Sequence, residues 1–364
     1  MSKVPPRYKV LIVDDSRAFR SILEKALNDN ADIEVVGSVA DGHQALEFLR
    51  RTPVDAITLD VEMPGWDGLQ TLSEISVLAQ KSPAGQEPGV IMVSAHTTKG
   101  ADTTIKALQQ GAFDFIAKPE ADTLEAGIES LRRQLLVKIR CYCSQRQLRN
   151  ARQGTGASSE STRSAAPSAK PARTFQGIVI GVSTGGPKAL GELLPRLCEA
   201  TELPILIVQH MPADFTKSLA ESLGKHCPFP VQEGLDGQAV ERRHVYLAPG
   251  GRHMMVRKTG SNAIVLSVND QPPENGCRPA VDVLFRSAAV AFGGETLAVI
   301  LTGMGADGTK GLAPLKRAGA YAIAQDEASC VVWGMPGSAV QQNLVDVILP
   351  LDKIADHIQS LCRR

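Results

Sequence analysis

Short, unbroken apolar runs recur along this chain and alternate with stretches of helical periodicity. Five runs lie in the first 118 residues: KVLIVD (9–14), IEVVGSV (33–39), DAITLD (55–60), GVIMVSA (89–95) and DFIAK (114–118). Strands that are buried on both faces have this pattern, because helices cover each side of a parallel sheet. The first part of the chain is therefore predicted to form a doubly wound α/β domain.

The same alternation returns after residue 174 and predicts a second, larger, Rossmann-like α/β domain. The strand candidates are 177–182, 204–209, 244–248, 296–302, 321–325 and 346–350, and the helix candidates are 187–198, 213–226, 280–292, 308–318 and 352–362. MMVRK and AIVLSV are separated by only four residues, Thr259-Gly260-Ser261-Asn262, which predicts a β-hairpin inserted into this domain.

The segment between the two halves has too few apolar residues to form a core. Residues 144–173 contain no Ile, Val, Phe, Trp or Tyr, and they carry six basic side chains against one acidic one. This composition is typical of a flexible linker. We divide the chain into a domain at 1–140, a linker at 141–173 and a domain at 174–364. The basic charge fits either a solvated tether or a strip that contacts an acidic partner.

Composition excludes several classes of protein. Lys plus Arg and Asp plus Glu both number 39, a neutral balance that argues against nucleic-acid binding. The longest uncharged run, 328–345, is interrupted by Gly, Pro, Gln and Asn, so direct insertion into a membrane is not expected. The first apolar run is too short for a signal peptide. Seven irregularly spaced cysteines without a CxxC pair indicate a reduced, cytoplasmic protein.

Polar residues end four of the strands expected in the first domain. Asp14 and Asp15 end the first strand, Asp60 the third, Ser94 the fourth and Lys118 the fifth. The carboxyl ends of parallel strands meet at one edge of a sheet, where ligands bind. Three carboxylates there favour Mg²⁺, and a hydroxyl and an ammonium suit phosphoryl oxygens. Taken singly, an aspartate at a strand end is usually a helix cap and a lysine is usually a solvated surface charge, but five such residues at four strand ends are hard to obtain by chance.

These residues lie in the motifs VDDS, LDVEMPGWDG, VSA and FIAKP, which resemble those of two-component receiver domains over residues 8–130. The resemblance implies a flavodoxin-like fold, with Asp60 as the phospho-acceptor and a chemotaxis histidine kinase as phosphoryl donor. It implies a Mg²⁺ site formed by Asp14, Asp15, Asp60 and the backbone carbonyl of Glu62. It also implies that phosphoryl binding and switching involve Lys118, Ser94 and Phe115.

The second domain carries a G-x-S-x-G motif, GVSTGGP, directly after its first strand. Ser183 would then lie beside a helix N-terminus, where backbone N–H groups can stabilise an oxyanion. The motif alone fits equally a serine that only caps the helix. His210 and Asp307 follow two other strands of the same sheet. A nucleophile, a base and an acid that orients the base are thus predicted at one sheet edge.

Two other interpretations of this domain compete with the triad. The order Ser…His…Asp differs from that of α/β-hydrolases, whose assignment would require His357 in the polar C-terminal helix. GMGADG is formally a G-x-G-x-x-G motif, with Asp326 where a ribose-binding acid belongs. Asp307 would, however, direct a carboxylate into the pyrophosphate site, so dinucleotide binding is disfavoured. A non-catalytic output domain that binds a partner or nucleic acid is the remaining rival.

The motifs GVSTGGP, QHMP, APGGRHM and LTGMGADG resemble those of chemotaxis protein-glutamate methylesterases over residues 174–362. The resemblance implies a Ser183, His210 and Asp307 triad that hydrolyses γ-glutamyl methyl esters on methyl-accepting chemoreceptors, under control of the receiver. It also implies deamidation of receptor glutamines. No cofactor is expected at the ester site. Backbone N–H groups near Thr184 and Met304 are the candidate oxyanion donors, and a histidine base predicts an apparent pKa of roughly 6 to 7 in kcat/KM.

Overall fold

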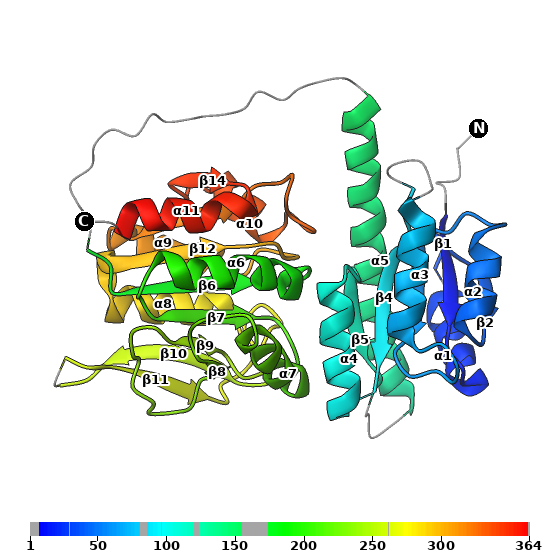
Figure 1. The fold of residues 1–364 in the computed structure, drawn as a ribbon, viewed down its shortest axis with the longest axis horizontal. Helices are drawn as coiled ribbons and strands as arrows, with labels where there is room; N and C mark the ends of the chain where they lie inside the picture. Colours follow the sequence, from blue (N-terminus) through cyan, green and yellow to red (C-terminus); the bar gives the residue numbers. More distant parts are fainter. Residues whose placement is uncertain are drawn as a thin grey trace. The chain divides into compact units, whose positions relative to one another are not determined.

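A computed structural model describes residues 7–28, 30–80, 86–95, 97–119, 124–154, 174–260 and 262–362. The chain divides into two compact units, Met1–Ser161 and Thr162–Arg364 (Figure 1). Each unit is built on a parallel sheet with helices, which confirms the predicted fold class. Among the described helices, none combines the length and apolar character needed to cross a bilayer.

The first unit has a five-stranded parallel sheet in the order β2-β1-β3-β4-β5. The chain leaves β1 in one direction to reach β2 and then runs the opposite way through β3, β4 and β5. Since such crossovers are right-handed, α1 and α2–α4 cover opposite faces of the sheet. The elements are β1 Tyr8–Val13, α1 Arg17–Asn28, β2 Ile33–Val39, α2 Gly42–Leu49, β3 Ala56–Asp60, α3 Gly68–Gln80, β4 Gly89–Ser94, α4 Thr98–Gln109, β5 Asp114–Ala117 and α5 Leu124–Gly154.

Helix α5 continues through Gly154, into the segment that was predicted to be a linker. The prediction that the flexible linker begins at residue 141 was therefore wrong for residues 141–154. The rest of the predicted linker, 155–173, lies outside the described residues.

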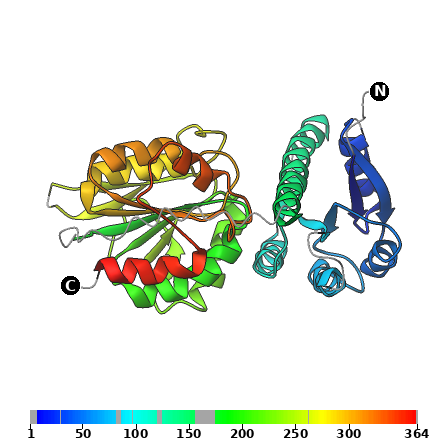
Figure 2. The ribbon, with the colours of Figure 1, turned by 90° about the horizontal axis from the view of Figure 1, so that it is seen from above.

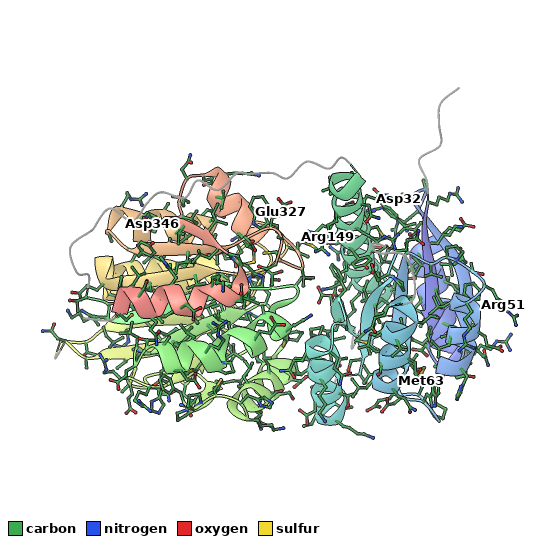
Figure 3. The ribbon with its side chains drawn as sticks, turned by 45° about the horizontal axis from the view of Figure 1, so that its top comes forward. Asp32, Arg51, Met63, Arg149, Glu327 and Asp346 are labelled. Atoms are coloured by element: carbon green, nitrogen blue, oxygen red, sulfur yellow. The ribbon has the colours of Figure 1, made fainter. Side chains whose placement is uncertain are left out.

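Contacts with distant segments of the first unit stabilise this helix. The Arg140 guanidinium donates two hydrogen bonds to Asp32, at 2.7 and 2.8 Å; Figure 3 labels Asp32. The Tyr142 hydroxyl donates to the carbonyl of Glu87 at 2.7 Å, and Cys143 is buried. A few long-range contacts therefore extend a helix whose own composition predicts disorder.

The second unit has a seven-stranded parallel sheet in the order β14-β13-β12-β6-β7-β9-β8. Helices α6 and α11 cover one face, and α8 and α9 cover the other (Figure 2). The strands are β6 Gly177–Val182, β7 Ile205–Gln209, β8 Val231–Glu233, β9 Val245–Leu247, β12 Thr296–Ile300, β13 Tyr321–Gln325 and β14 Val347–Leu349. The helices are α6 Gly186–Ala200, α7 Ala213–Gly224, α8 Val281–Ala291, η1 Gly293–Glu295, α9 Thr309–Arg317, α10 Met335–Gln341 and α11 Leu351–Cys362.

The chain leaves β6 towards β7 and leaves β12 towards β13, in opposite directions, although β6 and β12 are neighbours. Ligand sites of open α/β sheets form at such switch points, outside the carboxyl ends of the strands. The topology therefore predicts a ligand site formed by the residues that follow β6, β7 and β12.

The predicted hairpin is confirmed as β10 His253–Lys258 and β11 Ile264–Asn269, paired antiparallel. Its buried face, including Met254 and Leu266, belongs to the same apolar cluster as Leu284 of α8. The backbone N–H of Val256 also donates to the Ser287 hydroxyl at 3.0 Å. The hairpin thus fixes α8, whose N-terminus contributes to the site.

Candidate functional site

Ser183 lies on a tight turn between β6, which ends at Val182, and α6, which begins at Gly186. Its backbone N–H donates to the carbonyl of Thr302 at 3.0 Å, and its carbonyl accepts from the Gln209 side chain at 2.9 Å. Gly185 has a φ of 79°, and a Cβ there would lie 2.5 Å from Val331. Only glycine suits that position, so the motif fixes the Ser183 backbone.

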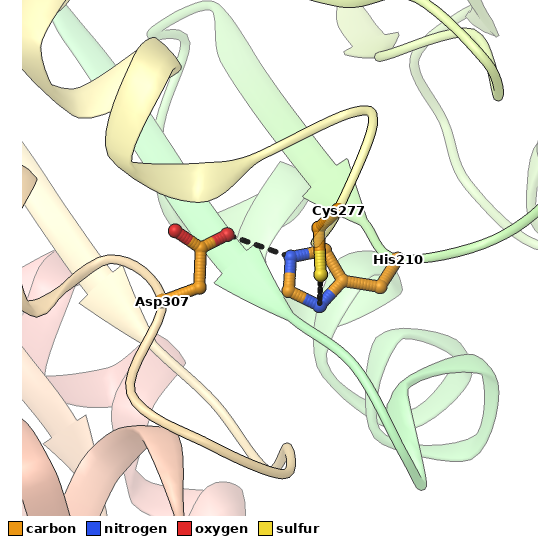
Figure 4. A group of neighbouring side chains, drawn as sticks. All are labelled: His210, Cys277 and Asp307. Carbon is orange, nitrogen blue, oxygen red and sulfur yellow. Dashed lines mark hydrogen bonds and ion pairs between the residues drawn. The ribbon is translucent and has the colours of Figure 1, made fainter. Parts of the chain in front are cut away.

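His210 lies next to this turn at the same edge of the sheet. Val182 pairs with Gln209 across β6 and β7, and the backbone N–H of His210 donates to the Val182 carbonyl at 3.1 Å. His210 and Ser183 therefore follow neighbouring strands at equivalent positions. The His210 Nε2 atom lies 2.8 Å from Oδ2 of Asp307, as Figure 4 shows. The structure thus brings the predicted histidine and aspartate together.

Asp307 is held in its ionised form by an unusually complete set of donors. Besides His210, its carboxylate accepts hydrogen bonds from the backbone N–H groups of Val281, Asp282 and Gly308 and from Nδ2 of Asn275, at 2.6, 3.1, 3.0 and 2.9 Å. Two of these donors form the N-terminus of α8, where the helix dipole favours negative charge. Burial raises the pKa of Asp307, but the His210 contact and these donors outweigh it and hold the pKa at about 2.

The Asp307 contact determines which imidazole nitrogen can act as a base. Since ionised Asp307 only accepts hydrogen bonds, it fixes the proton on Nε2 of His210 and leaves Nδ1 to accept another. No hydrogen bond joins the Ser183 hydroxyl to His210 among the described residues. The Sγ atom of Cys277 lies 3.6 Å from Nδ1 instead (Figure 4). The position beside Nδ1 is thus taken by the thiol of Cys277 and not by the hydroxyl of Ser183.

Sequence reasoning missed Cys277 and Asn275, which flank Gly276 in a tight turn. Asn275 and Gly276 both have positive φ, at 53° and 76°, as a type I′ turn requires. Glu274 and Cys277 exchange backbone hydrogen bonds on either side of them. The Asn-Gly dipeptide is a recognisable turn signal, but nothing in it indicates that the turn lies against His210.

The candidate oxyanion donors lie around the serine turn. Thr184 is buried, and its carbonyl accepts from the Thr302 hydroxyl at 2.9 Å. The N–H of Met304 has no acceptor among the described residues, and a Cβ at Gly303 would lie 2.8 Å from Cβ of Ser183. The loop after β12 therefore passes directly beside Ser183.

His357, which an α/β-hydrolase interpretation would need, lies elsewhere. Its Nε2 atom is 3.0 Å from the hydroxyl of Tyr321, the first residue of β13. Since Ser183 follows the last residue of a parallel strand, the two sites lie at opposite edges of the sheet. This geometry disfavours the α/β-hydrolase alternative.

The pH dependence of the reaction should reflect the contacts of His210. Burial lowers its pKa, but Asp307 and Cys277 outweigh this and raise the pKa from 6.5 to about 9. Because a raised pKa keeps the base protonated to higher pH, we expect kcat/KM to rise about tenfold per pH unit below an apparent pKa well above 7. This replaces the sequence-based expectation of 6 to 7. Initial rates across the pH range test it, and a plateau already reached at about pH 6 would contradict it.

The first unit places its polar residues at its own switch point, between β1 and β3. Ligand oxygens of Asp14, Asp15 and Asp60 lie within 4.8 Å of one another. Lys118 Nζ lies 3.1 Å from Asp14 and 2.8 Å from Asp60. Burial, followed by repulsion from Asp14, raises the pKa of Asp60 to about 6 despite the Lys118 contact. Such crowding of carboxylates around a buried acid fits a divalent cation site.

The other residues that the sequence motifs single out in this unit are Ser94, Glu62 and Phe115. The Ser94 hydroxyl is buried at the end of β4 and donates to the Ala95 carbonyl at 3.2 Å. The backbone N–H of Glu62 lies 3.4 Å from Oδ1 of Asp60. Phe115 is buried, with 8% of its surface exposed. Ser94 would have to leave the Ala95 carbonyl in order to donate to a phosphoryl oxygen.

The folds and these clusters define a response regulator: a receiver unit joined to an α/β output unit with a histidine–aspartate pair beside a serine turn. Residues 10–129 match the response regulator receiver domain, and residues 178–358 match the CheB methylesterase domain. The chain belongs to the CheB methylesterase family.

Relatives match nearly the whole chain. A protein-glutamate methylesterase/protein-glutamine glutaminase from Desulfotalea psychrophila is 43% identical, over 96% of this chain and 97% of its own length. A protein of the same name from Halalkalibacterium halodurans is 40% identical, over 98% and 99%. The crystal structure of the Thermotoga maritima CheB methylesterase catalytic domain has 40% identity and a TM-score of 0.50, and it covers 52% of this chain and 99% of that one.

Proposed function

We propose that this chain hydrolyses γ-glutamyl methyl esters on the cytoplasmic helices of methyl-accepting chemoreceptors, and that phosphorylation of its receiver controls the rate. The observation that carries the proposal is the short contact between His210 and Asp307 beside the Ser183 turn. Methanol release from methylated receptor membranes tests it directly. Membranes whose receptors carry no methyl groups are the control, and an absence of methanol would contradict the proposal.

The reaction begins when Nδ1 of His210 accepts the Ser183 proton and Oγ attacks the ester carbonyl. The negative charge on the carbonyl oxygen is stabilised by backbone N–H groups, for which those of Thr184 and Met304 are our candidates. The imidazolium returns its proton to the leaving methoxide, so methanol departs and an acyl-serine remains. Water then repeats the sequence through His210 and releases glutamate. Asp307 stabilises the imidazolium and keeps its Nε2 protonated.

Deamidation of receptor glutamines follows from the same chemistry. An amide carbonyl presents the same group to Ser183, and the leaving nitrogen takes its proton from His210. The names of the relatives pair the two activities. Ammonia release from receptors that carry glutamine at the modified positions tests this part of the proposal.

In the receiver we propose Asp60 as the phospho-acceptor and a chemotaxis histidine kinase as the donor. Asp14, Asp15, Asp60 and the carbonyl of Glu62 would hold Mg²⁺, which supplies charge neutralisation during phosphoryl transfer. Lys118 would bind a phosphoryl oxygen, Ser94 would donate to another, and Phe115 would report the change. The seven free cysteines support a cytoplasmic location.

Asp60→Asn should keep the basal esterase rate and lose its response to phosphodonors, because an amide cannot form the acyl phosphate. The rate with and without acetyl phosphate and Mg²⁺ measures this. Asp102→Asn, on α4, changes the same functional group elsewhere in the unit and should respond normally. Stimulation of Asp60→Asn as large as that of the unsubstituted protein would refute the role of Asp60.

A further inference from the structure

Cys277 lies beside His210 and has no part in the proposed reaction. Its thiol lies 3.6 Å from Nδ1 of His210, on the nitrogen that Asp307 leaves free (Figure 4). A nitrogen and a sulfur bound to one tetrahedral Zn²⁺, at about 2.0 and 2.3 Å, are separated by about 3.5 Å. The two atoms therefore already have the spacing that a shared metal ion requires.

Asp307 supplies the second feature of a metal site. A histidine that binds a metal through one nitrogen usually donates its other N–H to a carboxylate, which orients the ring and makes it more basic. Nε2 of His210 is 2.8 Å from Oδ2 of Asp307. The other oxygen, Oδ1, accepts from Asn275, Asp282 and Gly308, so the carboxylate is held in place without the metal.

We propose that His210 Nδ1 and Cys277 Sγ bind a borderline-soft divalent cation such as Zn²⁺, and that the bound ion inhibits the hydrolase. Ligand atoms of His210, Cys277 and Asp307 lie within 4.8 Å of one another. Nitrogen and thiolate ligands select Zn²⁺ over Mg²⁺, which prefers oxygen. The inhibitory effect, though not the binding, rests on the proposed function.

Binding is an exchange of protons for metal, without any oxidation. The Cys277 thiol and any imidazolium at Nδ1 lose their protons to solvent, and each atom gives an electron pair to the cation. Cys277 is itself partly exposed, so an ion can reach it from solvent. Inhibition follows because Nδ1 can no longer accept the Ser183 proton.

The receiver carboxylates are the competing cation site, and their chemistry is different. Asp14, Asp15 and Asp60 offer only oxygen and suit a hard ion. An excess of Mg²⁺ therefore occupies the receiver and leaves the histidine–cysteine site to the softer metal. Because the two sites prefer different metal ions, metal binding at each site can be measured separately in one full-length protein.

The direct test is Co²⁺ titration of the full-length protein in excess Mg²⁺, followed by thiolate-to-cobalt absorption in the near ultraviolet. We expect this band in the unsubstituted protein, its loss when Zn²⁺ is added, and its absence in Cys277→Ala. Cys362→Ala is the matched control, because Cys362 contacts Thr201, before the amino end of β7 and at the opposite sheet edge. An equal band in Cys277→Ala, or none in the unsubstituted protein, would overturn the site.

Inhibition is measured separately, as the Zn²⁺ concentration that halves each variant's own metal-free esterase rate. It should rise about tenfold or more in Cys277→Ala, since even an outer-shell partner contributes about 10- to 100-fold to metal affinity. Cys362→Ala should match the unsubstituted protein. Equal inhibition of Cys277→Ala would contradict the proposal. A cobalt band in a protein without esterase activity would instead reject the proposed function and keep the metal site.

Discussion

Ser183→Ala is expected to lower kcat by about 10⁴-fold or more, because a methyl group cannot attack a carbonyl. The protein should remain folded. The backbone contacts of Ser183 with Thr302 and Gln209 do not involve its hydroxyl, so alanine preserves them. Methanol release measures the rate, and thermal unfolding checks the fold. Ser360→Ala, an exposed serine on α11, should keep the full rate.

His210→Ala should cause a comparable loss, and the double variant should be little worse than either single one. Nucleophile and base act as one unit, so their losses do not add. A folded Ser183→Ala protein with nearly normal ester hydrolysis would refute the nucleophile. Additive losses would indicate that His210 acts on something other than the Ser183 proton.

Much of this site could be predicted because its first elements are local. The apolar run before Ser183 predicts the strand, and the glycines after it predict the turn. Pro187 is typical of the first turn of a helix. The strand-end rule for parallel sheets then brings His210 and Asp307 to the same edge without any knowledge of the pairing. These patterns therefore predict the position of the site and its three candidate residues.

The parts that could not be predicted depend on contacts between distant segments. Cys277 is 67 residues from His210 and follows a strand of the hairpin rather than of the parallel sheet, so the strand-end rule does not connect them. Residues 144–154 have the composition of a linker, but they continue a helix that contacts distant segments of the first unit, as Tyr142 contacts Glu87. The strand β8, VQE, contains a single apolar residue, and the short helix α10 contains both Pro and Gly, so neither has an apolar pattern that could be recognised.

Asp307→Asn is expected to lower kcat by about 10³- to 10⁴-fold, less than the loss of the nucleophile. An amide can donate to Nε2 of His210, which would move the imidazole proton to Nδ1 and leave no base for Ser183. The change also removes one acceptor from a buried group of donors that includes Val281 and Asn275. The effect of Asp307→Asn on folding must therefore be distinguished from its effect on the tautomer of His210.

Asp282→Asn separates the two effects, because Asp282 is a buried carboxylate in the same network that does not contact His210. Its carboxylate accepts from Gly311 and Asn275, and burial, with repulsion from Asp307, raises its pKa. An amide at this position keeps an oxygen that can accept from Gly311 and does not contact His210, so we expect far less activity to be lost. The pH profile gives a second criterion. The contact with ionised Asp307 helps to raise the pKa of His210, so Asp307→Asn should move the remaining activity to a lower apparent pKa, whereas Asp282→Asn should not. If both variants lost activity equally and kept the same profile, Asp307 would stabilise the fold of the loop rather than hold the imidazole in its reactive tautomer.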